Sequence, residues 1–178
     1  ADGSAKPRRL TSGKAAEGDP AWSPDSRRLA FTTKREGDEA SQVYVLDVVG
    51  GGEASRVTSL STGARKPKWR PDGGAILFTS VVLPGAPDDE AQKTIAAERK
   101  AQKYRVRAYE SFPIRNWDKW LDDTEAHVFV QGLEPGAKVR DLLAGTKLVA
   151  ERGFGGRMTD TGEELDTAWS PDGTSIVF

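Results

Sequence analysis

Cysteine is absent from this sequence of 178 residues, and histidine and methionine occur once each. Without cysteine the chain can form neither a disulfide nor a thiolate metal site. The single histidine, His127, limits any zinc site to one imidazole ligand from this chain. A lack of cysteine suits the cytoplasm and the bacterial periplasm equally, so it leaves the compartment open.

An excess of charge of one sign is also lacking, because 26 basic residues stand against 27 acidic ones. Proteins that bind nucleic acid usually carry a basic excess, so we expect no nucleic-acid partner. No run approaches the roughly 18 apolar residues of a membrane-spanning helix, so we expect no membrane partner. The first residues have no apolar signal-peptide core, although a chain that had already been cleaved would start in the same way. We expect a cytoplasmic, periplasmic or secreted protein.

Motifs of catalysis and cofactor binding are missing as well. There is no Gly-x-Ser-x-Gly nucleophile elbow and no phosphate-binding Gly-x-x-x-x-Gly-Lys. Residues 153–156 are rich in glycine but lack dinucleotide-binding spacing, so they predict a loop. His127 stands next to Val128 and Phe129 in a predicted strand, which favours a structural histidine over a catalytic base. We therefore expect no catalytic, cofactor-binding or metal-binding residues in this chain.

The sequence contains three pairs of adjacent carboxylates, at Asp88–Asp89, Asp122–Asp123 and Glu163–Glu164. The first precedes a predicted helix, and Glu163–Glu164 lies in a glycine-containing connection, where a solvated loop is the simplest interpretation. A lyase or glycosidase site in a central channel would need converging carboxylates and usually histidines or a metal. With one histidine, this is the weakest of the functions considered.

A repeated motif dominates what the sequence does contain. Each copy has Trp-x-Pro-Asp, then an aliphatic residue seven positions and a phenylalanine nine positions after the tryptophan. The copies run from Trp22 to Phe31, from Trp69 to Phe78 and from Trp169 to Phe178. The first two tryptophans are 47 residues apart and the next gap is 100, about two periods. The segment Arg-x-Thr-Ser, at 9–12 and 56–59, recurs with the same spacing of 47.

Each copy predicts a β-hairpin. Ser-Pro-Asp-Gly is a turn sequence, although Ser26 replaces the glycine of the later copies, and the flanking residues alternate as in strands. Residues 42–47 predict a third strand and residues 55–59 a fourth. Four antiparallel strands at a period of 40 to 50 residues are typical of a β-propeller blade. The tryptophans are expected to pack between adjacent blades.

The middle of the chain departs from this pattern. A strand from Ala75 to Leu83 ends at Pro84, and residues 88–103 predict an inserted helix with acids first and bases last. Residues 104–109 alternate like a strand, and Trp117 stands 48 residues after Trp69, as in a degenerate blade. We therefore predict an all-β, partial propeller of about three and a half blades, with units at about 13–59, 60–110, 111–144 and 165–178.

These blades, the helical insertion and the segment from Ile114 to Trp120, followed by His127 to Val130, resemble the N-terminal propeller of the prolyl oligopeptidase family of serine peptidases. The nearest likeness is to its dipeptidyl peptidase V and acylaminoacyl peptidase branch, where histidine more often stands at the position of Asn116. The resemblance implies that an α/β-hydrolase domain with a Ser-Asp-His triad would follow residue 178. It also implies that the propeller restricts entry to short or unfolded peptides.

Because the last copy stops in its second strand, we expect a fragment of a larger propeller, and residues 8–12 would be the outer strand of a blade completed elsewhere. The expected partners are the missing blades, the hydrolase domain and short peptide substrates. A second copy is a further expected partner, bound through open blade edges. A TolB-like propeller that binds proteins without catalysis is the alternative function, because TolB-like blades carry the same motif.

Overall fold

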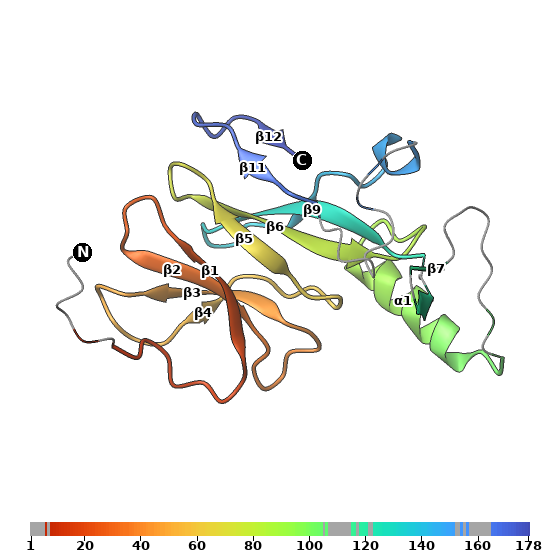
Figure 1. Cartoon of the computed structure of the whole chain (residues 1–178), viewed down its shortest axis with the longest axis horizontal. Coiled ribbons are helices and arrows are strands. Elements are labelled where there is room, and N and C mark those ends of the chain that lie inside the picture. The colour runs from red at the N-terminus through yellow and green to blue at the C-terminus, as the bar shows by residue number, and fades with distance from the viewer. Residues whose placement is uncertain are drawn as a thin grey trace.

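The computed structural model describes residues 6, 8–104, 106, 115–116, 118–120, 123–151, 154, 156 and 165–178. Its first sheet, here called blade 1, is antiparallel in the order β1-β2-β3-β4. The strands are Glu17–Trp22, Arg28–Thr33, Gln42–Asp47 and Ser55–Arg56. They occupy the first predicted unit, and Figure 1 shows them as the orange part of the chain.

The turns of the repeated motif are closed by local hydrogen bonds, which explains why the motif alone predicts hairpins. In each copy the aspartate side chain accepts a hydrogen bond from the backbone N–H two residues later. The donors are Arg27 to Asp25 (3.1 Å), Gly74 to Asp72 (2.8 Å) and Thr174 to Asp172 (3.0 Å). The residue directly after the aspartate has a positive φ in all three copies, at Ser26, Gly73 and Gly173.

The second sheet, blade 2, has the order β10-β9-β6-β5. Its strands are Arg65–Trp69, Ala75–Val82, Glu125–Gly132 and Arg140–Asp141, numbered β5, β6, β9 and β10. The structure therefore differs from the predicted units 60–110 and 111–144, because β9 and β10 complete the sheet that β5 and β6 begin. β6 and β9 pair over eight residues each and are mostly buried. Their pairing therefore provides hydrogen-bond partners for the buried backbone N–H and C=O groups of both strands.

An insertion separates β6 from β9. Its helix α1 covers Asp89–Ala101, which confirms the helix predicted at about 88–103. The short strands β7 (Arg115–Asn116) and β8 (Lys119–Trp120) pair only with each other among the described residues. Most of the strand predicted at 104–109, and Trp117, lie outside the described residues.

A third hairpin follows, made of β11 (Ala168–Trp169) and β12 (Ile176–Val177). The short 3-10 helix η1 (Leu148–Ala150) precedes it. The chain is thus a partial propeller, as predicted, and its described residues form two four-stranded blades and the first hairpin of a further one. Residues 8–12, predicted as an outer strand, form no strand in the structure.

The blades lie side by side, with their first strands adjacent (Figure 1). The core between blades 1 and 2 contains apolar side chains of both: Ala30, Val43, Leu60, Ala64, Trp69, Ile76, Phe78 and Phe129. A second cluster joins the other face of blade 2 to the third hairpin through Leu77, Trp169 and Ile176. Burial between blades is therefore the main stabilising contact of the fold.

Candidate functional site

Tryptophans of the repeated motif join neighbouring blades at two equivalent seams. The indole Nε1 of Trp69 donates a hydrogen bond of 2.9 Å to the carbonyl oxygen of Ala21 in blade 1. Trp169 makes the equivalent bond, of 3.3 Å, to Lys68 in blade 2. Each acceptor immediately precedes the motif tryptophan of its own blade. The prediction that tryptophans pack between blades holds for these two.

Charged groups reinforce the first seam. The guanidinium of Arg28 lies 4.6 Å from the centre of the Trp69 ring and donates a 2.9 Å hydrogen bond to the carbonyl of Gly73. On the inner strands, the carboxylate of Asp19 accepts a hydrogen bond of 3.2 Å from the backbone N–H of Lys66. Asp19 and Lys66 occupy the same repeat position and both have positive φ, where β1 and β5 shift register.

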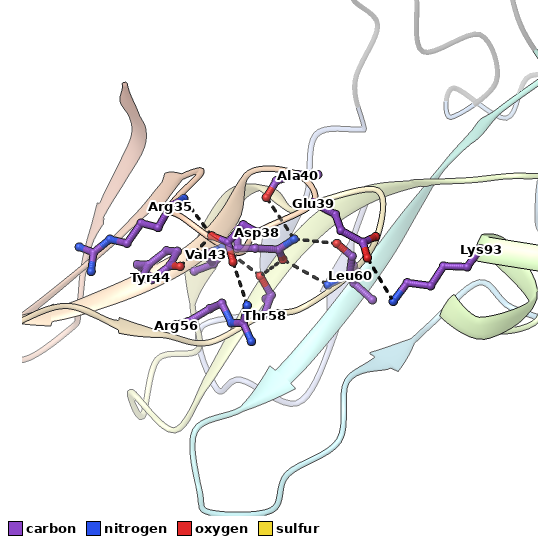
Figure 2. Close-up of polar contacts among 11 residues, drawn as sticks. Arg35, Asp38, Glu39, Ala40, Val43, Tyr44, Arg56, Thr58, Leu60 and Lys93 are labelled. Carbon is purple, nitrogen blue, oxygen red and sulfur yellow. Dashed lines mark hydrogen bonds and ion pairs between the residues drawn. The ribbon is translucent and has the colours of Figure 1, made fainter. Parts of the chain in front are cut away.

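A buried carboxylate of blade 1, that of Asp38, lies in the loop between β2 and β3 (Figure 2). Its carboxylate is 1% exposed and lies 2.8 Å from Nη1 of Arg56 on β4. The Tyr44 hydroxyl donates to it at 2.7 Å and the Arg35 backbone N–H at 3.0 Å. The guanidinium of Arg35 covers the ring of Tyr44, with 4.5 Å to its centre. The network fixes the loop to the outer strands of the blade.

These contacts shift the pKa values of Asp38 and Tyr44 in opposite directions. Burial opposes ionisation of Asp38, but the hydrogen bonds from Arg56, Tyr44 and the Arg35 backbone outweigh it and lower the pKa of the carboxyl below its usual value of 3.8. Burial, followed by the adjacent Asp38 carboxylate, raises the pKa of Tyr44. Asp38 is therefore a buried anion that stabilises the blade through donors on Arg35, Tyr44 and Arg56.

A second network lies beside it and involves the Thr58 of the second Arg-x-Thr-Ser segment. The buried Gln42 side chain donates to the carbonyl of Leu60 (2.6 Å) and accepts from the hydroxyl of Thr58 (2.8 Å). Thr58 in turn accepts from the Val43 backbone N–H at 2.9 Å. The Thr58 side chain therefore bonds to β3 just beyond the point where the backbone pairing of β4 with β3 ends. The sequence does not indicate the ion pair of Arg56, since its partner Asp38 lies in an irregular loop.

His127 lies on β9 with a side chain that is 6% exposed. Its Nδ1 is 2.7 Å from the Asp141 carboxylate, and its Nε2 is 3.7 Å from Glu125 and has no hydrogen-bond partner in the part of the chain that the structure describes. Ser80 stands opposite it in register, but the Ser80 hydroxyl donates to the carbonyl of Gly63 at 2.6 Å. Without a bond between hydroxyl and imidazole, Ser80 and His127 form no nucleophile–base pair in this structure.

The carboxylate pairs have structural contacts where they are described. Asp88 caps α1 by accepting from the Ala91 N–H at 2.8 Å, and Asp89 accepts from the Ser61 N–H at 2.7 Å. Asp123 binds Arg99 through two hydrogen bonds of 2.7 Å. Asp122 and the pair Glu163–Glu164 lie outside the described residues, as do Gly153 and Gly155 of the glycine-rich loop 153–156.

No cluster of three or more candidate metal ligands occurs in the described ranges. In that same part of the chain, no helix has both the length and the apolar character needed to cross a membrane. A cavity of about 460 Å³ lies on the face of blade 1 that points away from blade 2. Its lining includes Leu10, Lys14, Arg35, Leu46 and Ala54.

Comparisons with known proteins connect this fold to peptidases. The chain is 34% identical over 168 residues to the uncharacterized peptidase YuxL of Bacillus subtilis, which covers 94% of the chain. It is 28% identical over 180 residues to dipeptidyl-peptidase 5 of Porphyromonas endodontalis, which covers 99% of it. It spans only 22% and 23% of the length of these curated relatives.

Among solved structures, TolB from Acinetobacter baumannii aligns with 96% of the chain and 28% of its own length, at 17% identity and a TM-score of 0.48. No protein-family model matches the chain. The sequence similarity to the two peptidases extends over nearly the whole chain and includes both complete blades. These relatives, both named as peptidases, support the assignment of the chain to the β-propeller of the prolyl oligopeptidase family.

Proposed function

We propose that this chain is a non-catalytic part of a propeller that controls which peptides reach the α/β-hydrolase domain of a serine peptidase. The observation that carries the proposal is the 34% identity to a peptidase over 94% of the chain. The residues described here supply blades and seams, with no nucleophile bonded to a base. In such a division of labour, the propeller selects substrates by size and a separate domain hydrolyses them.

The proposed selection depends on blades that stay closed against each other. The seam at Trp69 combines an indole hydrogen bond, a guanidinium over the ring and a buried apolar core. Packing of this kind resists separation of the blades, because opening it would expose the ring and leave the Ala21 carbonyl without its partner. Large folded substrates are thereby kept outside, while short peptides pass along the open route that the rest of the protein provides.

The test uses the longer protein that contains this chain, with dipeptidyl and acyl-aminoacyl chromogenic substrates beside a long unfolded polypeptide. We expect the longer protein to hydrolyse the short substrates and to react with a fluorophosphonate, and the 178-residue chain to do neither. Trp69→Ala should raise hydrolysis of the long polypeptide relative to the short substrates.

Trp120→Ala is the matched control, because it removes a tryptophan that lies away from the seam and should leave the ratio unchanged. A longer protein that is inert to the fluorophosphonate would contradict the peptidase assignment and leave a binding propeller of TolB type. Activity with an unchanged ratio in Trp69→Ala would contradict the selection of substrates by the blades alone.

A further inference from the structure

Glu125, the first residue of β9, is a largely buried carboxylate that has no hydrogen-bond donor among the described residues. Its side chain is 22% exposed, and Nε2 of His127 lies 3.7 Å away, which is longer than a hydrogen bond. The neighbouring carboxylate of Asp141, in contrast, is bonded to His127 Nδ1 and to the Leu143 backbone N–H. Because burial of an unpaired charge costs free energy, Glu125 is suited to receive a cation from outside.

Glu125 and His127 line a cavity of about 230 Å³. The other described residues of its lining are aliphatic residues, proline and glycine, among them Val82, Leu143 and Val149. Lysine and arginine do not occur in that described lining. The carboxylate therefore faces an apolar space that no basic side chain from the same part of the chain enters.

The cavity belongs to blade 2 and its own loops. Its described walls are residues 82–87 at the end of β6, the start of β9, and residues 143–149 after β10. Side chains alternate along a strand, so Glu125 and His127 share a face of the sheet with Phe129. Phe129 is part of the core between blades 1 and 2. Glu125 and His127 therefore point towards blade 1, and neither the outer face of blade 1 nor the third hairpin contributes to the cavity.

The chemistry of these walls discriminates between cations. A primary ammonium group on an unbranched alkyl chain donates hydrogen bonds at its tip and packs its methylene groups on aliphatic surface, as a lysine side chain does. The α-ammonium of a peptide fits less well, because the adjoining amide needs polar partners that the described lining lacks. A divalent metal ion also fits less well, since the described residues contain no cluster of three candidate ligands.

We propose that this cavity binds an unbranched primary alkylammonium group, either the side chain of a lysine in a peptide or a free aliphatic amine. The ammonium binds the Glu125 carboxylate, and the alkyl chain packs against Val82, Leu143 and Val149. The cavity is smaller than the roughly 300 to 1,000 Å³ of pockets for larger ligands, which suits a single side chain. The site goes beyond the proposed function, because binding there requires no peptidase activity and can be measured apart from it.

The test is an NMR titration of the 178-residue chain with Nα-acetyl-lysine N-methylamide, in which the ring signals of His127 report on the cavity. His127 is the only histidine of the sequence, so its signals are assigned without ambiguity. We expect saturable shifts with a Kd on the order of 1 mM, as for a contact of this size. The derivative that is acetylated at Nε has no charge and should cause no saturable shift.

Two variants test the two parts of the site. Glu125→Gln keeps the shape of the side chain but removes its charge, and should weaken binding by about tenfold or more. Ala144→Phe keeps Glu125 but places a ring at the wall of the cavity, and should abolish binding. Glu134→Gln is the matched control, because it removes an exposed carboxylate outside the cavity and should bind as the native chain does. Thermal unfolding checks that each variant is folded.

Two further probes identify the source of the ammonium group. Tighter binding of the lysine derivative than of n-butylamine supports a lysine presented by a peptide, whereas equal binding supports a free aliphatic amine. Leucine amide presents an α-ammonium group and should bind more weakly than both. The proposal is overturned if the native chain shows no saturable shift, if a folded Glu125→Gln variant binds with native affinity, or if leucine amide binds most tightly.

Discussion

The indole nitrogen of Trp69 lies 2.9 Å from the carbonyl oxygen of Ala21, which is 48 residues earlier in the chain and in another blade. Trp169 and Lys68 repeat the relationship 100 residues further along, in the next seam. A single side chain thus links adjacent blades at the same point of each repeat. The geometry explains why the motif keeps tryptophan, which has both a large apolar ring and one N–H donor.

Replacing Trp69 should separate these two contributions. Trp69→Phe keeps a ring but loses the hydrogen bond to Ala21, and should lower the free energy of unfolding by about 1 to 2 kcal/mol. Trp69→Ala also leaves a cavity in the seam, and should lower it by about 3 to 5 kcal/mol. Urea unfolding measures both. Equal losses for the two variants would show that the hydrogen bond, and not the ring, dominates the seam.

The network of Asp38 predicts a dependence of stability on acid. The pKa of Asp38 is lower in the folded chain than its ordinary value of 3.8, so its ionised form stabilises the fold above that pH. The contribution is lost as the pH falls through the lower, folded-state pKa. Asp38→Asn should lower the free energy of unfolding at pH 7 by about 1.5 to 3 kcal/mol, and its difference from the native chain should shrink below pH 3.8.

The matched control for Asp38 is Glu53→Gln, which removes a carboxylate from an exposed position in the same blade. Its unfolding free energy should stay within about 0.5 kcal/mol of the native value at pH 7. A loss in Asp38→Asn that stays constant from pH 7 to pH 3 would rule out ionisation of Asp38 as the cause.

The turn of blade 1 predicts a stabilising substitution. Ser26 has a φ of 56°, while the equivalent residues Gly73 and Gly173 have 73° and 68°. A side chain at such a backbone angle is strained, so Ser26→Gly should raise the free energy of unfolding by about 0.5 to 1 kcal/mol. Gly73→Ser should lower it, because a Cβ there would also lie 3.0 Å from Arg28 Nη2. Thermal unfolding of both variants should shift in opposite directions, and a shared direction would contradict this.

Helix α1 predicts a local effect. Asp88 accepts the Ala91 N–H at 2.8 Å, so Asp88→Ala should cost about 1 kcal/mol and speed hydrogen exchange in the first turn of the helix. Asp88→Asn keeps an accepting oxygen and should retain most of the protection. If both variants exchange at the native rate, the cap does not limit opening of the helix.

Some sequence predictions fail in this chain because they concern contacts distant in sequence. The sequence pattern after Val82 indicates a broken repeat and therefore predicts a separate unit at 111–144. The structure instead pairs β9 with β6 across the insertion, with Phe129 opposite Phe78. Closing a long loop costs little more than closing a short one, so burial of two apolar strands decides the pairing. No local pattern signals that partnership, nor the contact between Asp38 and Arg56.

By itself, the sequence determined the hairpins of the motif, the third strand of blade 1 and the capped helix. The turns and the helix cap depend on contacts within a few residues, such as Asp25 with the Arg27 N–H, and the third strand shows in its own run of β-forming residues. Only the tertiary structure decided which strands complete blade 2 and which tryptophans are buried. Trp22 and Trp69 share a motif and a repeat position, yet one is open and the other enclosed, because burial depends on whether a neighbouring blade lies against the ring.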